Sequence, residues 1–93
     1  MVTERLDFQL QPGTEDRFLV VDEEIYGRWL RQQRGFTSRQ IVRYAAGRVA
    51  ILNFWKDKDS FNVAAKKPDS KILDAMMKVK VGNTFRMTSS RVF

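Results

Sequence analysis

One asparagine stands out because it lies inside an otherwise apolar stretch. Asn53 follows four apolar residues and precedes two aromatic ones in the segment RVAILNFW, residues 48–55. Burying an amide without a hydrogen-bond partner costs about 1–3 kcal/mol, so a backbone group, a water molecule or a ligand should bond to it. A cofactor-free oxygenase needs an amide or hydroxyl to hold the oxygen of a phenolate or a peroxide. Asn53 is therefore the candidate catalytic residue, and the alternative is a satisfied polar group of the core or of an interface.

Three aromatic residues could supply the flat apolar walls of such a site. Trp55 lies two positions after Asn53, on the same face of a strand. Tyr26 and Trp29 lie three apart, on one face of a helix. These rings and Asn53 are candidate ligand-binding residues, and the alternative is that all three rings belong to the core.

Charged residues could form two further kinds of site, one for a carboxylate and one for a metal ion. Arg39 and Arg43 stand four apart and share one face of a strand, where they could clamp a carboxylate in a cavity. Such residues are more often exposed on a strand or bonded across a dimer. Arg43 is a candidate ligand-binding residue. The acidic run of residues 22–24 points in several directions on a helix, so we expect a charged helix face rather than a metal site.

The composition excludes several chemistries. The 93 residues predict one domain, residues 1–93, and contain neither cysteine nor histidine. There is consequently no disulfide, no thiolate nucleophile, no Ser-His-Asp relay and no imidazole ligand for a metal or haem. We expect no metal and no cofactor. Because no apolar run reaches the about 18 residues of a membrane span and the N-terminus lacks a signal-peptide pattern, we expect a cytoplasmic protein without a membrane partner.

Positive charge gathers in the second part of the chain. Residues 1–34 hold five arginines and seven acidic residues, whereas residues 35–93 hold twelve basic and four acidic residues. Such a half can attract an anionic partner, although lysines on solvated helix faces explain it equally. The alternative function is therefore a non-catalytic binding or accessory protein that uses its basic half.

Hydrophobic periodicity gives the order of the elements. Apolar residues alternate over residues 6–10 and recur every three or four positions over residues 18–30, which predicts a strand and then an amphipathic helix. Thr14 should cap this helix and Gly35 should end it. Strands over residues 36–44 and 48–55 follow, joined by a hairpin turn at residues 45–47. Asp57 or Asp59 should cap a short helical piece over residues 61–65. A helix over residues 72–77 ending at residues 82–83, and a strand over residues 84–93, complete the chain.

This order, β-α-β-β-α-β, predicts an α+β ferredoxin-like sandwich. The third strand is apolar on both faces. One face carries Val49, Ile51 and Trp55, and the other carries Ala50, Leu52 and Phe54. A strand in a lone two-layer domain needs only one apolar face. A second copy of the chain is the simplest cover, so we expect a homodimer.

Five segments also carry a resemblance to a known family. They are FQLQPG, DEEIYGRWL, RGF, Asn53–Phe54–Trp55 and DSFNVAAKKPDSKIL. Through them, nearly the whole chain resembles the antibiotic biosynthesis monooxygenase superfamily, the dimeric α+β barrels, and particularly its small uncharacterised members. The resemblance implies a dimer whose sheets face each other and a ligand cavity between sheet and helices. It also implies cofactor-independent oxygenation of an aromatic substrate, or binding of a small aromatic or apolar ligand.

The chain differs from the family in one respect that reduces the range of expected activities. Many relatives carry a histidine where this chain has Ala64, and the haem-degrading members use a histidine as the axial iron ligand. Because this chain has no histidine, we do not expect the usual haem-degrading mechanism, and any proton transfer must fall to other groups.

The RNA recognition motif shares the element order but stacks bases on aromatic rings of its open sheet face. An alignment places Val49 and Ile51 where those rings should be, and the non-core face of the first strand carries Arg5, Asp7 and Gln9. We therefore expect no sequence-specific nucleic-acid partner.

Overall fold

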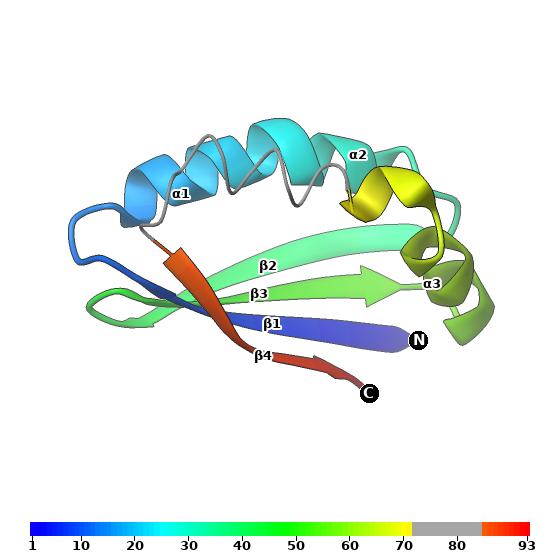
Figure 1. The fold of residues 1–93 in the computed structure, drawn as a ribbon. Helices are drawn as coiled ribbons and strands as arrows, with labels where there is room; N and C mark the ends of the chain where they lie inside the picture. The colour runs from blue at the N-terminus through cyan, green and yellow to red at the C-terminus, as the bar shows by residue number, and fades with distance from the viewer. Residues whose placement is uncertain (72–84) are drawn as a thin grey trace.

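Four antiparallel strands form one sheet in the order β2-β3-β1-β4, with helices against one face (Figure 1). The structure is a computed structural model, and it describes residues 1–71 and 85–93. The elements are β1 (Val2–Leu10), α1 (Glu15–Asp22), the π-helical segment η1 (Glu23–Gly27), α2 (Arg28–Arg31), β2 (Phe36–Ala45), β3 (Arg48–Trp55), α3 (Lys58–Ala65) and β4 (Phe85–Val92). The predicted ferredoxin-like fold is confirmed. The helix predicted over residues 72–77 and its end at residues 82–83 lie outside the described residues.

The core lies between the sheet and the helices and has two apolar clusters. The first joins β1, α1 and β3 through Phe8, Leu10, Phe18, Val49 and Ile51. The second joins α2, β3 and α3 through Leu30, Trp55 and Ala64. Alternation along β1 and β3 places these residues on one face, because successive side chains of a strand point to opposite sides.

The first helix differs from the continuous α-helix that the periodicity predicts. It runs from α1 through the π-helical segment η1 into α2. Residues 22–24 were expected to form a charged helix face. This prediction is wrong for Asp22, which is only 2% exposed. Asp22 follows the buried Phe18 by four positions, so the two side chains share the face that packs on the sheet.

A glutamate joins two turns at one end of the sheet. The Glu15 carboxylate accepts hydrogen bonds from the backbone N–H groups of Gly13 and Gly47, at 2.6 and 3.2 Å. Gly47 has a φ of +71°, as the predicted hairpin requires. The predicted side-chain cap by Thr14 is wrong, because its hydroxyl donates to the carbonyl of Gln11. Glu15 therefore holds the start of α1 against the β2–β3 hairpin.

Because of this contact, the stability of the fold should depend on pH in the acidic range. The backbone N–H donors lower the pKa of Glu15 from its ordinary value of 4.5. Its stabilising contribution is therefore complete above that value and is lost as the pH falls through the lower folded-state pKa. We expect Glu15→Gln to lower the Tm at neutral pH and to lower it less in acid. Thermal melts across this range test the expectation. Glu24→Gln, on an exposed helical position, is the control, and an equal loss at every pH would contradict the argument.

The predicted helix cap at Asp57 is confirmed. It precedes α3, and its side chain accepts from the backbone N–H of Ser60 at 2.8 Å. The predicted helix end at Gly35 is wrong, because α2 ends at Arg31 with Gln32 as its C-cap. Gly35 has a φ of +83° in the turn between α2 and β2.

The sheet face away from the helices carries apolar residues on β3 and charges on β1. Leu52 and Phe54 are half-buried there. On β1, Asp7 is buried and paired with Arg5 at 3.1 Å.

The predicted placement of Val49 and Ile51 on the open face of the sheet is wrong. Val49 and Ile51 face the helices and are fully buried. The open face of β3 instead carries Leu52 and Phe54, which alternate with the buried positions.

Candidate functional site

Three polar residues on neighbouring strands form a row of cross-strand partners on the helix-covered face of the sheet. Asn53 on β3 lies opposite Arg39 on β2 and Glu4 on β1. Its neighbours on the same face of β3, Ile51 and Trp55, belong to the first and second apolar clusters. The row Arg39–Asn53–Glu4 therefore lies between the two clusters, at the centre of the interior.

Three polar atoms at this place lack a hydrogen-bond partner among the residues that the structure describes. They are Arg39 Nε, Asn53 Oδ1 and Trp55 Nε1. Asn53 is fully buried, and its Nδ2 donates to Glu4 Oε1 at 3.0 Å, so only half of the amide is satisfied. Since nearly all buried polar atoms in proteins have partners, orphaned atoms on Asn53, on its cross-strand partner Arg39 and on Trp55 two residues along β3 indicate a place for a polar ligand atom or water. Two of them donate and one accepts.

A buried ion pair holds Arg39 from the helix side. Its Nη2 donates to Asp22 Oδ2 and its Nη1 to Glu23 Oε2, the latter at 3.1 Å. The side chains of Arg39 and Asp22 are 4% and 3% exposed. Burial raises the pKa of Asp22, and the positive charge of Arg39 opposes that rise only in part. Arg31 pairs with Glu23 at the surface.

Gly27 leaves the space that this ion pair occupies. A Cβ atom there would lie 2.4 Å from Arg39 Nη1 and 2.5 Å from Glu23 Oε2. A helical Gly→Ala change normally stabilises by about 1 kcal/mol. Here the arginine cannot move away, because Asp22 holds it in the interior.

We therefore expect Gly27→Ala to destabilise the protein by about 1–3 kcal/mol through overpacking. In an Arg39→Met background the same change should instead stabilise it, because the crowding guanidinium is gone. Urea denaturation of the four proteins measures both effects. The same sign in both backgrounds would contradict the packing argument.

The predicted aromatic residues meet at the same end of the interior. Tyr26 and Trp29 pack against the second cluster, with 5.6 Å between their ring centroids. Trp55 makes edge contacts with Phe36 and Phe61, at 5.4 and 5.8 Å. Ala64, at the position of the relatives' histidine, is buried in this cluster.

The structure thus gathers four of the five candidate residues and separates the fifth. Arg43 lies opposite Val49, four residues along β2 from Arg39. It is half-exposed and pairs with Asp16 at 2.5 Å. The two arginines therefore bind different acidic residues of α1 and η1 and form no shared clamp.

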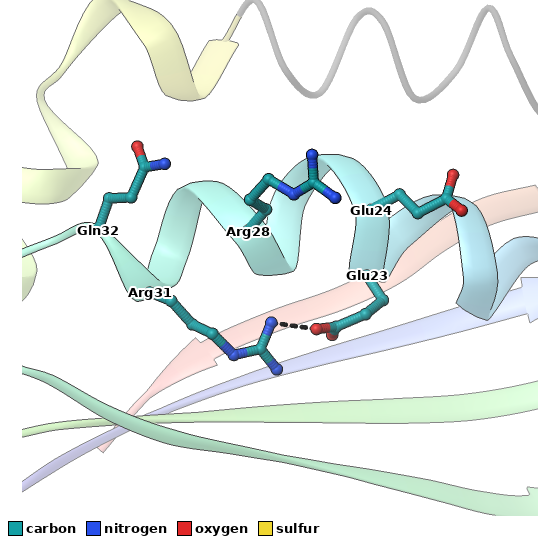
Figure 2. A pocket seen from close by; sticks show the side chains of 5 residues that line it. All are labelled: Glu23, Glu24, Arg28, Arg31 and Gln32. Atoms are coloured by element: carbon teal, nitrogen blue, oxygen red, sulfur yellow. Dashed lines mark hydrogen bonds and ion pairs between the residues drawn. The ribbon is translucent and has the colours of Figure 1, made fainter.

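Two of the open pockets lined by described residues lie away from Asn53. The first, of about 460 Å³, lies along η1 and α2, where Glu24 and Arg28 point away from the strands (Figure 2). The second, of about 430 Å³, lies between Gly35 and the start of α3. Both are lined mainly by charged or polar surface residues.

No group of acidic side chains in the described ranges is placed to hold a metal ion. Within those ranges, no helix combines the length and apolar character needed to cross a membrane.

Two contributors to the site were missing from the candidates. Asp22 was grouped with a solvated face, although its spacing from Phe18 places it inward. Glu4 follows the alternation of Leu6 and Phe8 and so shares their face. In both cases the periodicity of the helix or strand predicts that the side chain faces inward, although a charged residue type suggests an exposed position.

The fold has known counterparts, although no family model and no curated protein matches the sequence. The chain resembles a variant of SnoaB from Streptomyces nogalater, a cofactor-independent oxygenase, in which alanine replaces one asparagine. Their TM-score is 0.78 at 19% identity, over 99% of this chain and 89% of that one.

Two further structures share the fold. A Bordetella bronchiseptica protein, provisionally identified as an antibiotic biosynthesis monooxygenase, gives a TM-score of 0.71 at 20% identity, over 99% and 91% of the chains. A similarly identified Caulobacter crescentus protein gives 0.72 at 14% identity, over 99% and 86%. These similarities confirm the resemblance seen in the sequence: the chain has the fold of the antibiotic biosynthesis monooxygenase superfamily.

Proposed function

We propose that this protein binds a small phenolic compound beside Asn53 and oxidises it with molecular oxygen without a cofactor. The observation that carries the proposal is the group of orphaned atoms Arg39 Nε, Asn53 Oδ1 and Trp55 Nε1. A phenol hydroxyl can accept from an N–H group and donate to the amide oxygen, so its chemistry complements these donors and this acceptor. The aromatic rings of Tyr26 and Trp29 nearby suit a flat apolar ligand. SnoaB, which shares the fold, is a cofactor-independent oxygenase.

The reaction balances with oxygen alone. A phenol with a free para position and one O₂ give a quinone and one water. One oxygen atom becomes the second carbonyl, and the other leaves with the hydroxyl and ring hydrogens that the substrate loses. The substrate gives up four electrons and O₂ accepts four. The N–H donors of Arg39 and Trp55 would stabilise the phenolate from which electrons leave.

The proposal includes a homodimer formed through the sheet face away from the helices. Leu52 and Phe54 on that face are only half-buried within one chain. A second copy would cover them and close the barrel.

Oxygen consumption with 1-naphthol tests the function. Protein treated with a chelator, with no flavin added, should consume one O₂ for each 1,4-naphthoquinone formed. Asn53→Ala should lower the rate by about 10²-fold or more, since it removes a preorganised polar group. Asn62→Ala, on α3, is the matched control and should keep the rate. Saturable binding of naphthol without oxygen uptake would contradict the oxygenase and favour a binding protein.

A further inference from the structure

The buried carboxylate of Asp22 has no part in the binding geometry above, yet it contacts a residue that does. It lies on the last residue of α1 and pairs with Arg39 on β2. Burying a carboxylate is costly, and an ion pair in the interior often fails to repay that cost. The position of this pair beside the orphaned atoms suggests a chemical use.

The guanidinium of Arg39 contacts Asp22 and can also bind a ligand through its Nε atom. The N–H groups of an arginine form a rigid planar fork in which Nε and Nη2 share one edge. Asp22 Oδ2 accepts from Nη2, and Nε on the same edge has no partner among the described residues. An oxygen atom that accepts from Nε therefore binds the same guanidinium group that holds the Asp22 carboxylate.

The charges around the site oppose a further negative charge. Arg39 faces Asp22 and Glu23 from the helix side, while Glu4 binds Asn53 from β1. Arg31 compensates Glu23 only at the surface, where both side chains are largely exposed. If a bound phenol lost its proton to solvent, this buried group would gain a negative charge. Transfer of the proton to Asp22 keeps the charge constant, and burial already favours the protonated form of Asp22 by raising its pKa.

We propose that the hydroxyl of the phenol bound at Asn53 turns from Asn53 Oδ1 to Asp22, that Asp22 accepts its proton, and that Arg39 then pairs with the phenolate oxygen in place of Asp22. The O–H bond of the ligand breaks, its electron pair stays on the ligand oxygen, and a new O–H bond forms on the carboxylate. This step needs no other reactant. It rests on the proposed function, because it requires a phenol at this site.

The wild-type protein alone gives a first test with 4-nitrophenol, whose absorption spectrum distinguishes phenol from phenolate. Its para position is blocked, so it cannot form the quinone. At a pH where the free probe is protonated, the bound probe should show the phenolate spectrum. Titration calorimetry in buffers of different ionisation enthalpy should show no net proton release. Release of one proton to the buffer for each probe bound, or a bound neutral phenol, would overturn the proposal.

Variants give the second test. Asp22→Asn should bind the probe as the neutral phenol and lower oxygen consumption with 1-naphthol by about 10²–10⁴-fold. Asp22→Glu, which keeps a carboxylate, should restore part of the phenolate signal. Asp16→Asn, which alters the exposed ion pair of the same helix and strand, should match the wild type.

The outcomes separate this inference from the proposed function. If Asp22→Asn ionises the probe as the wild type does, Asp22 is not the acceptor, and the proposed function stands. If the wild type binds no phenol and consumes no oxygen, the proposed function fails and this inference fails with it. If Asp22→Asn does not fold, the calorimetry on the wild type decides.

Discussion

Replacing Arg39 with methionine should lower the free energy of unfolding by about 3–5 kcal/mol. The change leaves Asp22 as a buried carboxylate without its cation, and breaking one side of a buried ion pair carries a cost of this size. Both side chains are almost completely buried, so water cannot compensate for the loss. Urea denaturation monitored by tryptophan fluorescence measures the change.

The structure provides a matched comparison for this substitution. Arg43 lies on the same strand and face, and its pair with Asp16 is exposed. Arg43→Met should therefore cost at most about 1 kcal/mol. The double variant Asp22→Leu with Arg39→Met should recover most of the lost stability, since replacing a whole buried pair by apolar residues is often neutral. Equal costs at the two arginines would show that the Asp22–Arg39 pair is not buried in solution.

The second large effect concerns assembly. Leu52→Asp should raise the dissociation constant of the dimer by about 100-fold or more, because it places an unpaired charge in a buried apolar interface. Leu52 faces away from the helices, so the monomer should remain folded. Sedimentation at several concentrations measures the equilibrium, and circular dichroism checks the fold.

An apolar residue elsewhere on the surface gives the control. Val20 on α1 is 55% exposed, and Val20→Asp should leave the dimer unchanged. A wild-type protein that sediments as a monomer at micromolar concentration would contradict the dimer itself. A dimer that survives Leu52→Asp would place the interface on another face.

The parts of the structure that the sequence predicts depend on neighbours in the chain. Alternation predicts β1, and glycine predicts the turn at Gly47, because a single residue must adopt a positive φ there. Asn53 is found because a polar amide in an apolar strand needs an explanation wherever the strand lies.

The parts that it misses depend on how elements pack together. Arg39 on β2 and Asp22 at the end of α1 meet because the helix packs on the sheet, and Gly27 leaves room for the Arg39 guanidinium. The spacing of four residues from Phe18 indicates that Asp22 faces inward, but it does not show which residue of the sheet Asp22 meets there. Arg43 is similar to Arg39 in type and face, yet it lies at the exposed end of the strand. Only the packed structure separates the two arginines.

The indole N–H of Trp55 reports most directly on the central claim that a phenol oxygen binds the orphaned polar atoms. The chain contains only two tryptophans, so a ¹H–¹⁵N spectrum shows two indole signals, and Trp55→Phe assigns them. During titration with 4-nitrophenol, the Trp55 signal should move downfield until the site is saturated, as its N–H gains an acceptor. A Trp55 signal that stays in place while the probe saturates the protein would contradict the account.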